Sequence, residues 1–402
     1  MTRIIQKYQL IISIAVLSIF VLIHQGLCAE DFTSWLTALR HEAQTKGISE
    51  ATIHEALDKL EPIPRVIELD RKQPEFTQAF WRYLDARVTE NRIERGRTLL
   101  KKHEKLFNTI EMHYGVQPRF LVAFWGLETN FGDYLGVFPV ISSLATLAHD
   151  TRRSDFFRSE LFDALSIIDA GHISAANMLG SWAGAMGQPQ FMPSTFIRFA
   201  VDGDGDGRKD IWHNLSDVFA SAANFLSESG WQGDKTWGRE VKISSDFNLD
   251  LTGLQIKKTL AAWQVLGVRK INGEELPRVN IKGSVILPAG HDGPAFLVYN
   301  NFQTILRWNR SNLYAIAVGH LADRITGKAP FQTERPTSEQ RLSRNQVEKI
   351  QELLVAKGYD PGPIDGVLGS QTRQAVKEFQ HTAKLPADGY PTPELLEVLG
   401  KK

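Results

Sequence analysis

The strongest hydrophobic pattern in the chain lies in the stretch VQPRFLVAFWGLETNFGD, residues 116–133. Apolar side chains recur there every three or four residues, which predicts one helix that begins at Pro118 and stops at Gly132. The one acid on its apolar face is Glu128. Because a carboxyl group among aromatic rings resists ionisation, we expect the pKa of Glu128 to rise toward neutrality. The stretch by itself also fits a surface acid or a buried acid paired with an arginine.

Helical periodicity extends along most of residues 30–327, with one interruption. Upstream of the central stretch, the pattern predicts amphipathic helices that include 75–86 and 92–113. Between 233 and 300, short apolar runs bounded by glycine and proline predict a small β-containing insertion. Its strands are expected at 240–243, 284–287 and 296–298. The pattern therefore predicts a mainly α domain with a minor sheet.

A second, smaller domain is expected at the C-terminus. Residues 328–340 are polar, contain two prolines and show no periodicity, so we interpret them as a linker. Residues 341–402 then form a unit of roughly 60 residues, near the lower size limit for independent folding. Asp365-Gly366 and Asp388-Gly389 are similar turns that each precede a helix, which indicates an internal repeat. The pattern predicts three helices, at 345–357, at 370–381 and in the final segment.

The N-terminus has the pattern of an export signal. A positively charged start precedes an apolar run at 10–23, which is short for a membrane-spanning helix. We expect cleavage after Ala29, so that residues 1–29 are removed and the protein works in the periplasm. The mature chain would then contain no cysteine, since Cys28 is the only one. A lipid anchor on Cys28 and an uncleaved membrane anchor are the alternatives.

Composition restricts the class of ligand. The chain of 402 residues has 46 Lys+Arg and 46 Asp+Glu, so it has no net positive field for nucleic acid. It also has nine Trp and eight Tyr residues. Aromatic faces serve both nucleic-acid and carbohydrate sites. The charge balance excludes the first as a general partner and leaves the second.

An acidic loop, DGDGDGRKD at 202–210, resembles a calcium-binding EF-hand loop in its spacing. Carboxylates occupy loop positions 1, 3, 5 and 9, and position 7 would supply a main-chain carbonyl. The candidate metal residues are Asp202, Asp204, Asp206, Arg208 and Asp210. Position 12, which normally carries a bidentate acid, is His213. Weak calcium binding and a hydrophilic turn without an ion therefore both remain open.

Two further segments carry polar side chains in unusual settings. Arg152 and Arg153 are adjacent, which fits either a solvated surface or a clamp for carboxylate or amide oxygens. The stretch SWAGAMGQPQFMPSTF follows at 181–196, and its glycines allow close backbone approach. Its Ser181, Met186 and Gln190 could line a groove or only connect two helices.

These segments together resemble the membrane-bound lytic murein transglycosylase B family over nearly all of residues 31–328. The resemblance rests on five motifs in order: LDRKQPEF at 69–76, YGVQPRFLVAFWGLETNFG at 114–132, SWAGAMGQPQFMPS at 181–194, the DGDGDG loop, and NFQTILRWNRSNLYAIAVG at 301–319. The C-terminal unit resembles the peptidoglycan-binding domain that is often fused to such enzymes. The chain departs from some relatives at Trp308, where they carry tyrosine, and at Gln188-Pro189, where they carry tyrosine-glycine.

The resemblance implies a lysozyme-like α+β catalytic domain with a helical N-terminal part, followed by the three-helix domain. It implies cleavage of the β-1,4 bond between N-acetylmuramic acid and N-acetylglucosamine in peptidoglycan, without a required cofactor. The family's catalytic acid falls on Glu128. Its substrate-binding positions fall on Arg152, Arg153, Ser181, Gln190, Asn309 and Tyr314.

One acid suffices for such a reaction when the substrate supplies its own nucleophile. The C6 hydroxyl of the muramic sugar would attack C1 and leave a 1,6-anhydro end, with no water consumed. Two alternatives are a muramidase that adds water and a non-catalytic scaffold that only binds the wall. Peptidoglycan glycan strands are the expected partner, other cell-wall enzymes are possible partners, and a monomer is the expected state.

Overall fold

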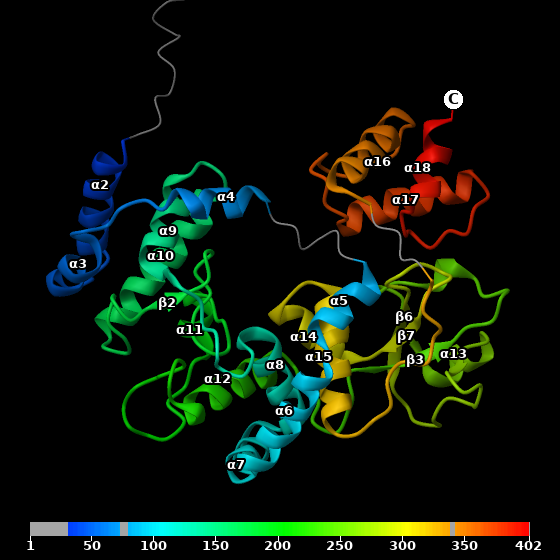
Figure 1. Ribbon diagram of the computed structural model, residues 1–402, viewed down its shortest axis with the longest axis horizontal. Helices are drawn as coiled ribbons and strands as arrows, with labels where there is room; N and C mark the ends of the chain where they lie inside the picture. Colours follow the sequence, from blue (N-terminus) through cyan, green and yellow to red (C-terminus); the bar gives the residue numbers. More distant parts are fainter. Residues whose placement is uncertain (1–30, 73–78, 338–341, 402) are drawn as a thin grey trace, which may run out of the picture.

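The computed structural model describes residues 31–72, 79–337 and 342–401 (Figure 1). The predicted signal segment, residues 1–29, therefore lies outside the described residues, as does the end of the predicted linker. Within the described ranges, no helix is long and apolar enough to cross a membrane. The chain is mainly helical, with one five-stranded sheet and one short two-stranded sheet.

The N-terminal part is a series of helices, as the periodicity predicts. They are α2 (Phe32–Thr45), α3 (Glu50–Leu57), α4 (Pro64–Lys72), α5 (Phe80–Arg87), α6 (Glu90–Lys102) and α7 (Glu104–Tyr114). The prediction of one helix over 92–113 is wrong, because His103 leaves the helical conformation and separates α6 from α7. Both helices contact α8.

Helix α8 (Pro118–Thr129) lies near the centre of the larger domain (Figure 1). Pro118 occupies the first turn, as predicted, and every residue from Phe120 to Leu127 is buried. The helix stops earlier than predicted, since Asn130 already has a left-handed backbone with φ of 51°. Left-handed residues cannot continue a right-handed helix. Glu128 thus lies in the last turn and is only partly buried.

Helices from distant parts of the sequence complete the larger domain. They are α9 (Val140–His149), α10 (Ser154–Asp169), α11 (Pro193–Phe199), α12 (Leu215–Glu228), α14 (Asn300–Trp308) and α15 (Asn312–Ile325). Of these, α15 packs along α8 and α12 also contacts it. The short pair β1 (Phe138–Pro139) and β2 (Leu179–Gly180) joins the segments before α9 and after α10.

The predicted β-containing insertion is present. Its antiparallel strands are ordered β4-β6-β7-β3-β5, with β3 at Gly238–Lys242, β4 at Lys258–Thr259, β5 at Arg269–Lys270, β6 at Lys282–Ile286 and β7 at Ala295–Val298. The three longer strands lie within two residues of their predicted positions. The insertion includes α13 (Leu260–Val265) and has its own apolar core around Trp263 and Leu297.

The C-terminal unit contains three helices, as predicted: α16 (Arg344–Ala356), α17 (Ser370–Thr382) and α18 (Pro393–Gly400). They enclose a separate apolar core. The internal repeat is also visible, because a buried glutamine holds each Asp-Gly turn. Gln351 accepts from Gly366 N at 2.9 Å, and Gln380 accepts from Gly389 N at 2.8 Å.

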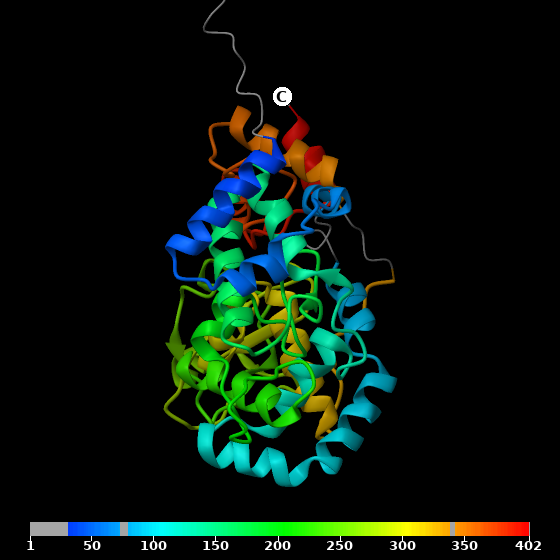
Figure 2. The ribbon, with the colours of Figure 1, turned by 90° about the vertical axis from the view of Figure 1, so that its left-hand side faces the viewer.

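The C-terminal unit packs on the β-containing insertion and also reaches α4. Hydrogen-bonded pairs that make these links include His291–Asp388 at 2.8 Å, Lys377–Leu249 at 2.9 Å, His381–Asp250 at 2.6 Å and Arg344–Arg71 at 3.1 Å. Figure 2 shows the C-terminal helices at the same end of the elongated molecule as α2 and α4. The C-terminal unit is therefore docked on the larger domain rather than only tethered to it.

Candidate active site

Glu128 is held by two donors from the far end of the catalytic domain. Trp308 donates its indole N–H to Oε1 at 2.9 Å, and the Tyr314 hydroxyl donates to the same oxygen. Trp308 is the last residue of α14, and Tyr314 lies in the first turn of α15. The tight connection between these helices thus places both donors on one carboxyl oxygen. Because Oε1 accepts both bonds, a proton on this carboxyl group belongs on Oε2.

Aromatic rings fix the position of the Trp308 donor. Its ring centroid lies 4.5 Å from that of Phe124, 5.2 Å from Phe191 and 4.9 Å from Phe225. These rings come from α8, the loop before α11, and α12. Contact from three sides restricts the indole, so its N–H stays directed at Glu128.

Tyr314 is buried and stays neutral. Burial is the main cause that raises its pKa well above the usual value, and the nearby charge and hydrogen bond of Glu128 raise it further. The phenol therefore remains a hydrogen-bond donor over the whole physiological pH range. Tyr314 was expected at the site from the sequence, whereas Trp308 appeared there only as a departure from some relatives.

The connection between α14 and α15 also contains Asn309. Its side-chain oxygen accepts from Ser311 N at 3.0 Å, and Ser311 in turn caps α15. The structure thus gives Asn309 a local role in shaping the turn between the two donors of Glu128. Its side chain is partly buried.

Arg152 and Arg153 converge on a buried acid that the sequence reasoning did not assign. Asp70 on α4 is 2% exposed and accepts from Arg152 at 2.8 and 2.7 Å. Arg153 donates to the same carboxylate. Burial pushes the pKa of Asp70 upward, but the hydrogen bonds and charges of the two arginines outweigh it and hold the pKa below its usual value. Each arginine side chain is still about two-fifths exposed, at 45% and 42%.

The segment 181–190 is a compact loop whose polar groups mostly form hydrogen bonds within the loop. Ser181 Oγ accepts from Ala183 N at 3.3 Å and Ala185 N at 3.0 Å. A Cβ atom on Gly180 would lie 2.2 Å from the Ala185 carbonyl oxygen, which explains the glycine there. Gln190 has a φ of 51° and donates to the carbonyl of Gly187 at 2.8 Å.

Met186 lies in the core and does not face solvent, since it is 0% exposed. The expectation that its side chain lines a groove therefore does not match its position. A neighbour, Gln188, instead connects this loop to α8, because it accepts from the Trp125 indole at 2.6 Å and donates to the Trp212 carbonyl at 2.8 Å. Met186 and Gln188 support the loop from the inside.

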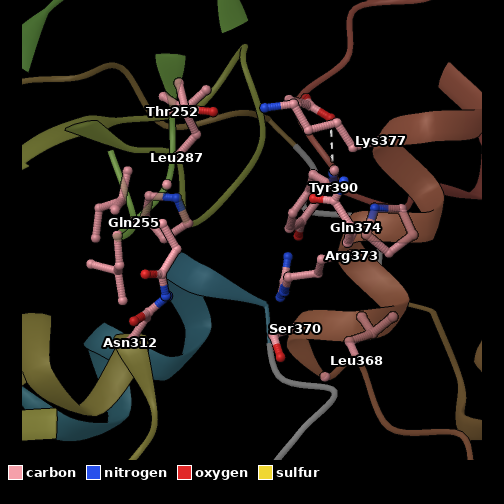
Figure 3. A pocket seen from close by; sticks show the side chains of 18 of the residues that line it. Thr252, Gln255, Leu287, Asn312, Leu368, Ser370, Arg373, Gln374, Lys377 and Tyr390 are labelled. Carbon is pink, nitrogen blue, oxygen red and sulfur yellow. Dashed lines mark hydrogen bonds between the residues drawn. The ribbon is translucent and has the colours of Figure 1, made fainter. Parts of the chain in front are cut away.

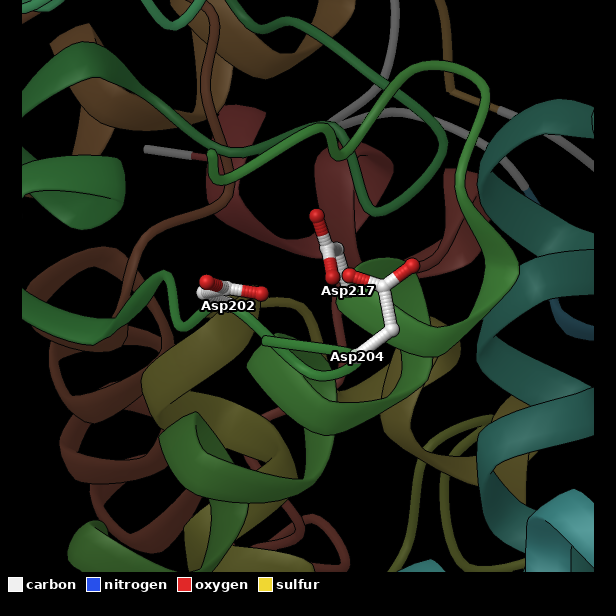
Figure 4. A group of neighbouring side chains, drawn as sticks. All are labelled: Asp202, Asp204 and Asp217. Atoms are coloured by element: carbon white, nitrogen blue, oxygen red, sulfur yellow. The ribbon is translucent and has the colours of Figure 1, made fainter. Parts of the chain in front are cut away.

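The acidic loop brings together a different set of residues from the one that the spacing predicts. The carboxylates of Asp202, Asp204 and Asp217 lie within 4.8 Å of one another (Figure 4). Asp217, from the first turn of α12, is fully buried, and its pKa is raised by burial and then by the charges of Asp204 and Asp202.

The other candidate metal residues make local bonds. Asp206 accepts from Arg208 N at 2.8 Å, and Asp210 accepts from Trp212 N and His213 N, both at 2.9 Å. Asp210 therefore shapes the turn before α12. Asp217, four residues after loop position 12, lies close to Asp202 and Asp204, a neighbour that a fixed loop spacing does not detect.

Comparison with known proteins assigns both parts of the chain to described families. Residues 31–323 match the family described as "Transglycosylase SLT domain", and residues 343–399 match "Putative peptidoglycan binding domain". The membrane-bound lytic murein transglycosylase B of Escherichia coli (strain K12) is 28% identical over 292 residues, which cover 69% of this chain and 79% of that protein.

Solved structures agree. SltB3 from Pseudomonas aeruginosa, determined in complex with NAG-anhNAM-pentapeptide, is 43% identical with a TM-score of 0.89, covering 92% of this chain and all (100%) of that one. The Escherichia coli lytic transglycosylase Slt35 in complex with calcium is 26% identical with a TM-score of 0.62, covering 72% and 92%. The chain therefore belongs to the SLT-domain lytic transglycosylase family, enzymes that act on peptidoglycan, and carries a C-terminal peptidoglycan-binding domain.

Proposed function

We propose that Glu128 is the single acid and base with which this lytic transglycosylase cleaves the MurNAc-β-1,4-GlcNAc bond of peptidoglycan. The observation that carries the proposal is the partly buried carboxyl group with Trp308 and Tyr314 both donating to Oε1. A carboxyl group oriented in this way presents a defined oxygen to the substrate. Proton transfer by such a positioned group typically contributes about 10²–10⁴-fold to the rate.

The reaction runs in two steps. Glu128 first gives its proton to the glycosidic oxygen as the bond from that oxygen to C1 of the muramic sugar breaks. The oxygen of the muramic N-acetyl group stabilises the cation that develops at C1. Glu128, now a carboxylate, takes the proton from the C6 hydroxyl, and the C6 oxygen bonds to C1. The proton returns to the enzyme, no water is consumed, and the product ends in a 1,6-anhydro ring.

Replacing Glu128 with Gln removes the transferable proton and tests this assignment. We expect turnover to fall by about 10²–10⁴-fold while binding to glycan persists. The matched control is Glu104→Gln, an exposed acid on α7. Mass spectrometry of digested peptidoglycan reads the product: anhydro-muramic ends support the mechanism, reducing ends indicate a muramidase, and no products indicate a scaffold. Wild-type rates in Glu128→Gln would remove Glu128 from the mechanism.

Arg152 and Arg153 contact the glycan or its peptide stem in this proposal. Their partly exposed guanidinium groups support it, because Asp70 fixes them while part of each faces solvent. Ser181 holds the oxygen of the N-acetyl group, and Gln190 and Asn309 line the same groove. These roles are the ones that the resemblance implies for the matching positions.

A structural calcium ion completes the acidic loop in the proposal. Asp202, Asp204 and Asp217 offer oxygen ligands of the kind that calcium prefers, and a cation would relieve the repulsion among three close carboxylates. The calcium complex of Slt35 shows that a relative binds this ion. The ion would stabilise the loop before α12 and takes no part in the chemistry.

The protein works as a monomer on the wall, in the periplasm, after export. Support comes from the export pattern in the sequence and from the relatives, whose substrate is the cell wall. Other cell-wall enzymes are possible partners. The C-terminal domain supplies attachment to the insoluble polymer, which raises the local concentration of the catalytic domain.

A further inference from the structure

A large cavity separates the C-terminal domain from the catalytic domain. Its volume is about 800 Å³, and its walls come from α17, from the loops of the β-containing insertion and from the connection between α14 and α15. Figure 3 shows side chains from both domains facing this space, with Gln255 and Asn312 on one side and Arg373 and Gln374 on the other. None of the residues proposed for the chemistry at Glu128 lines it.

The most unusual group in the cavity is Arg373 on α17. Its side chain extends into the space (Figure 3), and its guanidinium group lies 5.7 Å from the ring of Tyr390. Among the described residues, no carboxylate lies within ion-pair distance of it, and the charge of Asp388 acts on it from farther away. Burial lowers the pKa of Arg373, with a smaller opposing effect from Tyr390 and Asp388. The Arg373 side chain is only partly buried, so a ligand can reach it, and a bound anion would stabilise a cation that has no ion pair.

A second arginine, Arg310, lines the same cavity from the α14–α15 connection, and its side chain is exposed. Within the described part of the chain it forms no ion pair. The acids of the cavity are already engaged. Asp250 binds His381 at 2.6 Å, and Asp388 binds His291 at 2.8 Å. The third acid, Glu378, accepts a hydrogen bond from Gln374 at 2.9 Å. Lys377 is also engaged, because it donates to the main-chain carbonyl of Leu249 at 2.9 Å.

We propose that this cavity binds a free carboxylate of the peptide stem of peptidoglycan, held between Arg373 and Arg310. Guanidinium groups match carboxylates through paired hydrogen bonds. The remaining walls offer the amides and hydroxyls that a peptide backbone requires, from Thr252, Gln255 and Asn312. The inference rests on the proposed substrate and adds a second place where the enzyme reads it, away from Glu128.

The site also touches the catalytic centre through one element. Arg310 and Asn312 lie between Trp308 and Tyr314, the two residues that donate to Glu128. A ligand carboxylate on Arg310 would therefore restrain the connection that sets the position of both donors. Binding by the C-terminal domain and the arrangement of the catalytic acid share this connection.

The test is a calorimetric titration of the full-length Glu128→Gln protein with a synthetic pentapeptide stem. One peptide carries a free C-terminal carboxylate and the other a C-terminal amide. We expect the carboxylate peptide to bind at least about tenfold more tightly than the amide, which corresponds to about 1.4 kcal/mol. Added Arg373→Gln or Arg310→Gln should abolish that preference, and Arg373→Lys should restore part of it because it keeps the charge.

The matched control is Arg278→Gln, an arginine whose side chain is 90% exposed and lies outside the cavity. It should leave both affinities unchanged. Equal affinity for the two peptides would overturn the proposal, as would a preference that survives Arg373→Gln or that is lost only with Arg152→Gln. If Arg373→Gln lowers the melting temperature, that variant is set aside and the affinities of Arg373→Lys for the two peptides test the proposal. The titration requires no cleavage, so it can fail while Glu128 remains the catalytic acid.

Discussion

At the scale of single residues, the site depends on hydrogen-bond donors more than on a second acid. Glu128 was evident from the sequence because it interrupts an apolar face. Its donors were not, since Trp308 and Tyr314 are separated from it by 180 and 186 residues. Asp70 was missed for the same reason, because its arginine partners lie 82 and 83 residues away. Hydrophobic periodicity reports neighbours within one element and contains no information on such pairs.

The Trp308 donor gives a sharp substitution test. Trp308→Phe keeps an aromatic ring among Phe124, Phe191 and Phe225 but removes the N–H that orients Glu128. A hydrogen bond to a charged group is worth about 1.5–3 kcal/mol, so we expect kcat to fall by roughly 10- to 100-fold. Trp308→Tyr offers a hydroxyl instead and should recover most of the loss. Single-turnover kinetics on a purified glycan strand measures both, and equal rates for the two variants would exclude an orienting role.

A buried histidine predicts the acid sensitivity of the fold. His320 on α15 stacks on Phe331 at 3.8 Å, and burial, with the charges of Arg324 and Arg335, lowers its pKa to about 3. The unfolded chain binds a proton near pH 6.5, so it gains protons first as the pH falls. Stability from this residue is complete above about pH 6.5 and is lost progressively toward pH 3, on the order of 3–5 kcal/mol.

Denaturant unfolding between pH 7 and pH 4 measures this effect. His320→Phe should make the free energy of unfolding less dependent on pH in that range while keeping the ring stack. His41→Phe, at an exposed position on α2, is the control and should leave the slope unchanged. A slope in His320→Phe equal to that of the wild type would show that other groups govern acid unfolding.

At the scale of elements, regular periodicity was reliable and element ends were not. Helix α8, the strands β3, β6 and β7, and the three C-terminal helices could be predicted because each has a regular run or pattern of apolar residues bounded by turn residues. The break at His103 and the early stop at Asn130 depend on packing around α8, which the local sequence does not reveal. The group of neighbouring acids in the acidic loop was predicted incompletely for the same reason. Asp217 is distant in the loop pattern, and the position of α12 brings it close to Asp202.

The acidic loop offers a test with an internal control. Asp217→Asn should abolish calcium-dependent stabilisation, because it removes the buried ligand. Asp206→Asn should preserve it, since Asp206 lies outside the close group of three carboxylates. In wild type, calcium at 100 times its dissociation constant should add about 2.7 kcal/mol to the free energy of unfolding. Thermal melts with and without calcium compare the three proteins, and identical melts in wild type would exclude binding.

At the scale of the whole molecule, two domains share one substrate. The C-terminal domain is docked by hydrogen bonds to the β-containing insertion and to α4. Its separate core made it recognisable from the sequence, but its docking surface could not be predicted, because the contacts are polar and lie at scattered positions.

Deleting residues 341–402 separates attachment from cleavage. A linked binding unit adds effective concentration only on a polymer, so sacculus pull-down should weaken severalfold or more while cleavage of short soluble fragments changes less. The two measurements use the same protein, and Glu128→Gln provides a control that binds without cleaving. Equal losses in both assays would contradict a role in attachment.

The long separation between Glu128 and its donors also has a consequence in time. A chain is synthesised from its N-terminus, so α8 emerges long before α14 and α15. Until residues up to Tyr314 have emerged and folded back onto α8, the acid lacks the groups that orient it. A growing or truncated chain therefore cannot assemble the site. An enzyme able to damage its own cell thus becomes active only once the catalytic domain is complete.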